Sequence, residues 1–179
     1  SSIDGNTVGG IAMYTSSTGF STYGNWCGIY VEAGNVTIGT NAGNIIGAAS
    51  GTGSVYVACN TSGSNTKIVG IRAGSTGTVT VTNNIIGSIT ASAATSSLVE
   101  GITGISTGGA GTFVITNNTV GNTTPENLRL GFFTTAGNLS NTGTPTSSSG
   151  ATNSFTGIES STSQGNVTIA NNTVQGMGM

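Results

Sequence analysis

Short runs in which β-branched and polar residues alternate recur along the chain and predict half-buried β-strands. Residues 78–82 read Thr-Val-Thr-Val-Thr, and residues 166–169 read Asn-Val-Thr-Ile. Every second side chain of such a strand points to the same face, so one face can be buried while the other stays polar. No amphipathic helical period lasts beyond one turn, and no stretch approaches the ~20 apolar residues of a membrane helix. The pattern predicts an all-β chain without membrane insertion.

A longer motif, which includes these strands, repeats along the chain. A strand, an Asn, a small residue and then Val or Ile occur together five times, around Asn6, Asn44, Asn84, Asn118 and Asn172. A Gly-Ile pair precedes the last four copies, with Gly28, Gly70, Gly104 and Gly157 lying 16, 14, 14 and 15 residues before the Asn. From each Asn to the next Gly-Ile pair the interval is 22, 26, 20 and 39 residues. Insertions therefore collect in one connection of the repeat.

This spacing predicts a right-handed parallel β-helix, a β-solenoid of about four to five coils with one variable loop face. Each repeat supplies three short strands that cannot bury their apolar sides alone, so successive coils stack around a narrow core. Two inward columns are expected, one of Ile29, Ile71, Ile105 and Ile158 and one of Ile38, Val81, Ile115 and Ile169. Asn84, Asn118 and Asn172 are expected at one structural corner, in left-handed geometry and bonded between coils.

The organisation of the chain follows from the same repeat. Residues 1–179 form a single β-helix segment, in which 134–154 are expected to be a mobile loop and Leu128–Phe132 an additional strand. A solenoid needs caps over its terminal strands, and the sequence shows no capping segment at either side. We therefore expect this segment to belong to a longer array, flanked by further repeats of the same polypeptide.

The charge content narrows the function. The chain has three Lys or Arg, five Asp or Glu and no His. Three scattered cations cannot neutralise a phosphate backbone, so no nucleic-acid partner is expected. His-centred triads, paired carboxylates and clusters of metal ligands lack their residues, so we expect no enzyme, no cofactor and no metal site. Arg72 and Glu159 share a register two coils apart and are expected to belong to an exposed row of mixed polar residues.

Three sets of side chains remain as candidates. The aromatic residues Tyr14, Tyr23 and Trp26 fall in a first loop, 12–26, and either contact a glycan or partner or form the loop's own small core. Thr37, Thr80 and Thr168 are expected to point outward from the middle strand, in a row interrupted by Val114. Such a row fits a structural face, an ice-binding face or a contact with a neighbouring chain or glycan. Cys27 and Cys59 fit either a disulfide or two buried thiols, a structural role in both cases.

Two units carry a family resemblance. Residues 77–87 read Gly-Thr-Val-Thr-Val-Thr-Asn-Asn-Ile-Ile-Gly, and residues 165–174 read Gly-Asn-Val-Thr-Ile-Ala-Asn-Asn-Thr-Val. They resemble the right-handed β-helix repeats of large secreted surface proteins of Bacteroidota-type bacteria, which use the type IX secretion route and include gliding-motility adhesins. The resemblance implies a non-enzymatic segment of an extracellular cell-surface adhesin or filament, a stiff spacer that presents loops to a surface or glycan. A surface glycan or another cell-surface or secretion component is the expected partner. A self-contained ice-binding or glycan-binding module is the alternative, ahead of a polysaccharide lyase or hydrolase.

Overall fold

The computed structural model describes residues 1–15, 24–59, 66–93, 100–132, 154–160 and 165–178, and this part of the chain contains β-strands and turns but no helix. Four strands recur in the same order. The first coil contains β1 (Ser2–Ile3), β2 (Thr7–Val8), β3 (Ile11–Thr15) and β4 (Trp26–Val31), and the second contains β5 (Val36–Ile38), β6 (Ile45–Gly47), β7 (Val55–Cys59) and β8 (Thr66–Gly74). The third contains β9 (Thr78–Thr82), β10 (Ile85–Gly87), β11 (Ile89–Ala93) and β12 (Glu100–Gly108). The fourth contains β13 (Thr112–Thr116), β14 (Thr119–Val120), β15 (Leu128–Phe132) and β16 (Ser154–Ser160), and β17 (Val167–Ala170), β18 (Thr173–Val174) and β19 (Met177–Gly178) follow.

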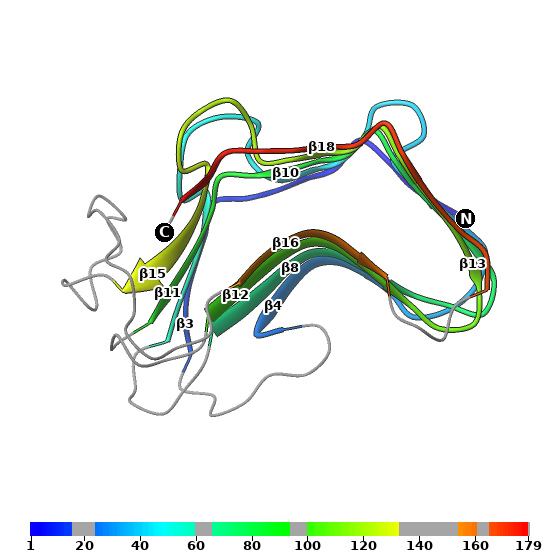
Figure 1. Cartoon of the computed structure of the whole chain (residues 1–179), viewed down its shortest axis with the longest axis horizontal. Helices are drawn as coiled ribbons and strands as arrows, with labels where there is room; N and C mark the ends of the chain where they lie inside the picture. The colour runs from blue at the N-terminus through cyan, green and yellow to red at the C-terminus, as the bar shows by residue number, and fades with distance from the viewer. Residues whose placement is uncertain (16–23, 60–65, 94–99, 133–153, 161–164, 179) are drawn as a thin grey trace.

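Equivalent strands of successive coils pair in parallel and build four sheets. Sheet A has the order β1-β5-β9-β13-β17, sheet B has β2-β6-β10-β14-β18, sheet C has β3-β7-β11-β15-β19 and sheet D has β4-β8-β12-β16. Viewed along the stack, the strands of each sheet overlie one another, and sheet D lies between sheets A and C and arches toward sheet B (Figure 1). The all-β prediction is confirmed, and the stacked parallel sheets have the arrangement of a β-solenoid.

The two predicted inward columns are present. Ile71 pairs with Ile29 on one side and with Ile105 on the other, and Ile105 pairs with Ile158. The second column runs in the same way through Ile38, Val81, Ile115 and Ile169. The inner members of both columns belong to one hydrophobic core, in which Ile71, Val81 and Ile105 are fully buried. Both columns of the sequence analysis are thereby confirmed.

The Gly-Ile motif marks the narrowest part of this core. A Cβ atom at Gly70 would lie 2.6 Å from Ile86 Cγ2 and 2.6 Å from the carbonyl oxygen of Gly104. A Cβ atom added at Gly28, Gly104 or Gly157 would likewise lie 2.5–2.7 Å from a methyl group of sheet B, on Ile46, Val120 and Val174 respectively. Only glycine allows so close an approach of two backbones. The motif therefore exists because sheet D bends inward against sheet B.

Asparagines occupy the turn between sheets A and B in every coil. The backbone N–H and the Nδ2 of Asn84 donate to Oδ1 of Asn118 at 3.0 and 2.9 Å, and Nδ2 also donates to the carbonyl of Ile38 at 2.9 Å. The same pattern links Asn6 to Asn44, Asn44 to Asn84 and Asn118 to Asn172. One continuous asparagine ladder thus joins all five coils.

The prediction of left-handed geometry at the ladder asparagines is wrong by one residue. Positive φ values occur at the residue before each of them: 67° at Gly5, 67° at Gly43, 58° at Asn83, 58° at Asn117 and 56° at Asn171. The preceding residue turns the chain, and this turn aims the following amide along the stack. Gly and Asn are the residues that adopt this conformation most readily, and only they occupy the position.

The structure also departs from the sequence analysis in its strand count and its connections. Each of the first four coils has four strands instead of three, because β3, β7 and β11 form sheet C with β15, the predicted strand at Leu128–Phe132. The segment 12–26 is not a single loop, since 12–15 belong to β3 and Trp26 begins β4. The connection between sheets B and C also varies in length. It comprises 48–54 in the second coil and 121–127 in the fourth, but only Ser88 in the third. The expected mobile loop lies outside the described residues except Ser154, which begins β16.

Candidate functional site

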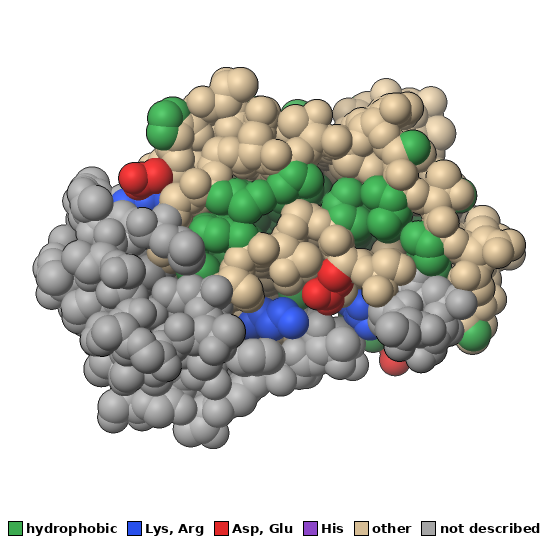
Figure 2. Space-filling view, viewed as in Figure 1, with side chains coloured by type: hydrophobic (Ala, Val, Ile, Leu, Met, Phe, Trp, Pro, Cys, Tyr) green, Lys and Arg blue, Asp and Glu red, His purple; other side chains and the backbone are tan. Residues whose placement is uncertain are grey.

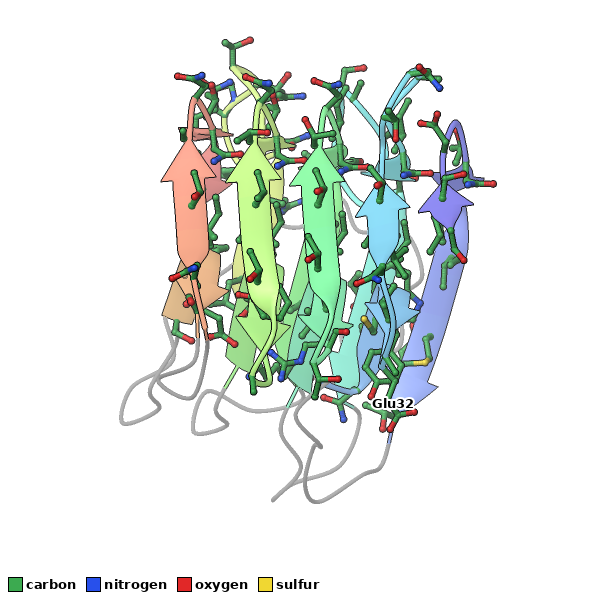
Figure 3. All side chains as sticks on the ribbon, turned by 90° about the vertical axis from the view of Figure 1, so that its right-hand side faces the viewer. Glu32 is labelled. Carbon is green, nitrogen blue, oxygen red and sulfur yellow. The ribbon has the colours of Figure 1, made fainter. Side chains whose placement is uncertain are left out.

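The outward face of sheet A carries a row of threonines in register. Thr80 lies between Thr37 and Val114 in the paired strands, and Val114 pairs with Thr168. Beside this row, Thr78 pairs with Thr112 and Thr82 pairs with Thr116. Figure 3 looks onto this face, with the five strands of sheet A side by side. The structure therefore brings the three predicted threonines into one row, and Val114 interrupts it as expected.

The side chains of this face are regularly spaced and uncharged. Paired strands lie about 4.7–4.9 Å apart, and alternate residues of a strand follow at about 6.6–6.8 Å. One hydroxyl pair is already satisfied, because Thr116 Oγ1 donates to Thr82 Oγ1 at 3.2 Å. A grid of hydroxyl and methyl groups with these spacings can order water or contact a flat partner. It holds no charged group and no nucleophile with a neighbouring base.

A second polar row crosses the outward face of sheet D. Arg72 Nη1 donates to Ser106 Oγ at 2.7 Å, and Ser106 Oγ donates to Glu159 Oε1 at 2.6 Å. Ser106 is fully buried. The expectation of an exposed row is therefore wrong at its centre, where the serine hydroxyl bridges the cation and the anion. A buried polar group has to be hydrogen-bonded, and this bridge meets the requirement over three coils.

This bridge lacks the parts of an acyl-transfer site. A serine nucleophile is normally activated by a histidine held by a third group, and the sequence has no histidine. The Ser106 hydroxyl donates its proton in a hydrogen bond to the Glu159 carboxylate, and its oxygen accepts a hydrogen bond from Arg72. The arrangement balances two charges that would otherwise be partly buried without a partner. Its evident role is to hold β8, β12 and β16 together.

Two of the three predicted aromatic residues, Tyr14 and Trp26, lie in different sheets. Tyr14 lies in sheet C and packs edge-on against Tyr56, with ring centroids 6.3 Å apart and planes at 76°. Its hydroxyl is buried without a hydrogen-bond partner among the described residues, and burial raises its pKa. Trp26 lies in sheet D and packs against the hydrophobic core. Tyr23 lies outside the described residues.

A shallow pocket beside β4 includes residues that the sequence analysis did not select. It has a volume of about 340 Å³ and is lined by Gly24, Asn25, Trp26, Cys27, Tyr30 and Glu32. Tyr30 is 42% exposed, and Glu32, labelled in Figure 3, is also exposed. The sequence signal was present but weak: Tyr30 stands two residues after Gly28, at the position that Arg72, Ser106 and Glu159 occupy in later coils. An aromatic face, a carboxylate and an amide are groups that bind sugar hydroxyls and rings.

The two cysteines lie in different sheets. Cys27 is in sheet D beside Val69, and Cys59 ends β7 in sheet C beside Thr15. Cys27 has a free thiol that donates to the carbonyl of Ile29 at 3.3 Å. Burial raises the pKa of this thiol to about 11, against smaller opposing effects of backbone hydrogen bonds at Arg72 and Ile29 and of the Arg72 charge. A thiol that stays protonated at neutral pH is a poor nucleophile and a poor metal ligand. The side chain of Cys59 lies outside the described residues.

Within the described ranges, no three His, Cys, Asp or Glu side chains come together as a set of metal ligands. No helix in the same ranges is long and apolar enough to span a bilayer. Comparisons with protein families, with curated proteins and with solved structures gave no match to this chain.

Proposed function

We propose that this chain is a non-enzymatic structural segment of an extracellular cell-surface adhesin or filament, in which the solenoid acts as a stiff spacer. One observation carries the proposal: strand pairing in all four sheets and the asparagine ladder link every coil to the next without a break from β1 to β19. Force applied along such a stack loads many backbone hydrogen bonds in parallel. That property suits a protein that holds a contact away from a surface.

The variable connections support the presentation of contacts. The strands of sheet C and sheet D are joined by 16–25, 60–65, 94–99 and 133–153, so the most variable segments all begin and end at the same side of the stack. A surface glycan is the proposed partner, and Tyr30 in β4 and Glu32 directly after β4 offer the chemistry for it. The resemblance to Bacteroidota-type surface proteins supports type IX secretion as the export route and a gliding-motility adhesin as one setting.

The proposal includes a right-handed coil. Each turn of the stack joins parallel strands of one sheet by a crossover connection, and such connections are right-handed in about 98% of cases because of the twist of the strands.

Force spectroscopy on the 179-residue chain, pulled from its two ends, tests the spacer function. We expect the chain to resist extension and then to lengthen in steps of about one coil. Asn84→Ala should lower the force of these steps, because it removes one rung of the ladder. Smooth extension at the low force of a flexible linker would rule out a stiff spacer. Antibody labelling of intact cells of the source organism tests the location, and labelling only after permeabilisation would contradict a surface protein.

Ice binding is the second candidate, favoured by the in-register threonine rows of sheet A. Thr80 lies at the centre of the sheet, so Thr80→Tyr would disrupt the flat face without touching the core. If this face binds ice, the purified chain should show thermal hysteresis and the variant should lose it. A matched substitution on the opposite side, Ser50→Tyr in the exposed turn after β6, should leave the hysteresis unchanged. Absence of hysteresis in the unmodified chain would eliminate this candidate.

A further inference from the structure

The corner between sheets B and C is made by a long, a short and again a long connection in the second, third and fourth coils. Residues 48–54 make it in the second coil and 121–127 in the fourth, in segments of equal length, whereas Ser88 alone makes it in the third. Both long connections stand out from the stack at this corner, in cyan and yellow-green in Figure 1. The turn of the third coil therefore lies between two longer segments that can reach over it.

The two long connections meet over this turn. Asn122 Nδ2 donates to the carbonyl of Ala49, and Asn127 Nδ2 donates to the carbonyl of Gly51 at 2.7 Å. Asn122 is held in place within its own segment, because its Oδ1 accepts from the Thr124 N–H at 2.6 Å. In a solenoid each repeat normally contacts only its neighbours. These hydrogen bonds instead join the second coil to the fourth, and we call them, with the two connections, the clasp.

Hydrogen bonds, and not apolar packing, hold the clasp together. Residues 48–54 read Ala-Ala-Ser-Gly-Thr-Gly-Ser and residues 121–127 read Gly-Asn-Thr-Thr-Pro-Glu-Asn, with no apolar side chain larger than proline. Figure 2 shows the outside of this corner, at its upper left, made mainly of polar side chains and backbone. Asn127 is nevertheless fully buried. Loss of its hydrogen bond is therefore costly, because water does not replace a partner at a buried amide.

The turn beneath the clasp is strained. Ser88 has a φ of 54° and is 1% exposed, and a residue with a Cβ atom adopts positive φ rarely and at a cost. The second coil holds this turn, since the Ser54 N–H donates to Ser88 Oγ and the Val55 N–H to the Ser88 carbonyl, both at 3.0 Å. The fourth coil holds the next residue, since the Ile89 N–H donates to the carbonyl of Asn127 at 3.1 Å. A strained turn persists only where its surroundings over-determine it.

We propose that the clasp keeps the corner of the third coil closed and couples the second coil to the fourth. Asn127 joins the two tasks, because its carbonyl holds Ile89 and its side chain holds the connection of the second coil. The corner then opens only when both long connections separate from each other. All of these hydrogen bonds lie within the second to fourth coils, and the inference stands independently of the adhesin proposal.

Native-state hydrogen exchange of the 179-residue chain, followed for single amides by NMR, tests this coupling. In Asn127→Ala the N–H groups of Val55 and Ile89 should exchange about tenfold faster, because the clasp no longer holds the corner closed. Val55 is the decisive reporter, since its N–H bonds to Ser88 and not to Asn127. Asn122→Ala breaks the other hydrogen bond of the clasp and should change both amides in the same direction. The amide of Val81, in sheet A of the third coil, should keep its rate in both variants.

The matched control is Asn166→Ala, which removes an exposed amide away from this corner and should leave all three exchange rates unchanged. Faster exchange at Ile89 alone would overturn the proposal, because it would reflect only the local bond to Asn127. Unchanged exchange at Val55 and Ile89 would also overturn it. An equal increase at Val81 would do the same, since it would mean that the whole stack loosens. If circular dichroism shows that Asn127→Ala does not fold, Asn122→Ala decides by the same criteria.

Discussion

At the scale of single residues, the two consecutive residues at the turn between sheets A and B have different structural roles. The first residue of each pair adopts positive φ, and the second makes the ladder. The sequence already contained this division, because the first position is Gly or Asn in all five coils while the second is always Asn. Glycine and asparagine are the residues that adopt the positive φ of the first position most readily, and only an amide that both donates and accepts can link coils on either side.

Substitutions at the two positions should therefore differ in kind. Asn84→Ala removes an acceptor for the backbone N–H of Asn44 and a donor to the carbonyl of Ile38, both in a buried environment. Each buried group left without a partner costs about 1–3 kcal/mol, so we expect a loss of about 3 kcal/mol in the free energy of unfolding. Asn83→Gly keeps the positive φ accessible and should change stability by less than about 0.5 kcal/mol. Denaturant unfolding of both variants measures the difference, and equal losses would show that the ladder contributes no special stability.

At the scale of elements, the strand β8 shows where a glycine is required and where it is not. Gly70 faces Ile86 and the carbonyl of Gly104 across the narrow core, whereas a Cβ at Gly74 in the same strand would meet nothing closer than 3.8 Å. Gly70→Ala should therefore cost about 1–3 kcal/mol through overpacking. Gly74→Ala should be neutral, or stabilising by about 0.4–1 kcal/mol, because it only restricts the unfolded chain. Thermal unfolding of the pair tests this, and tolerance of Gly70→Ala would mean that sheets B and D can move apart.

The elements also show why some strands were predictable and others were not. Sheet A was evident because its strands alternate and lead into the asparagine motif, and sheet B because its strands follow the ladder asparagine directly. Strands β3, β7 and β11 read Ile-Ala-Met-Tyr-Thr, Val-Tyr-Val-Ala-Cys and Ile-Thr-Ala-Ser-Ala. They share no motif and follow connections of different length, so only their pairing with neighbouring coils identifies them as strands. Parallel pairing between coils is a long-range property that a local pattern does not encode.

At the scale of the whole molecule, register was predictable and burial was not. The spacing of Gly-Ile pairs placed Arg72, Ser106 and Glu159 in one row, and the structure shows this row. It did not reveal that Ser106 is fully buried and hydrogen-bonded on both sides, because burial depends on the inward arch of sheet D. Likewise, Tyr14 and Trp26 are close in sequence but belong to different sheets. The threonine row, which depends on register alone, was placed in full.

The constancy of the ladder has a consequence for how this chain can evolve. Consecutive ladder asparagines are 38, 40, 34 and 54 residues apart in sequence, yet their side-chain contacts stay between 2.9 and 3.0 Å. Added residues are absorbed in the connections between sheets B and C and between sheets C and D, and they do not alter the spacing of the asparagines along the stack. Each coil thus combines strands and a turn of constant geometry with connections whose length differs from coil to coil. Substitutions and insertions in the connection between sheets C and D of one coil therefore leave the core packing of the other coils unchanged. The solenoid can gain a new contact in this way without losing stability.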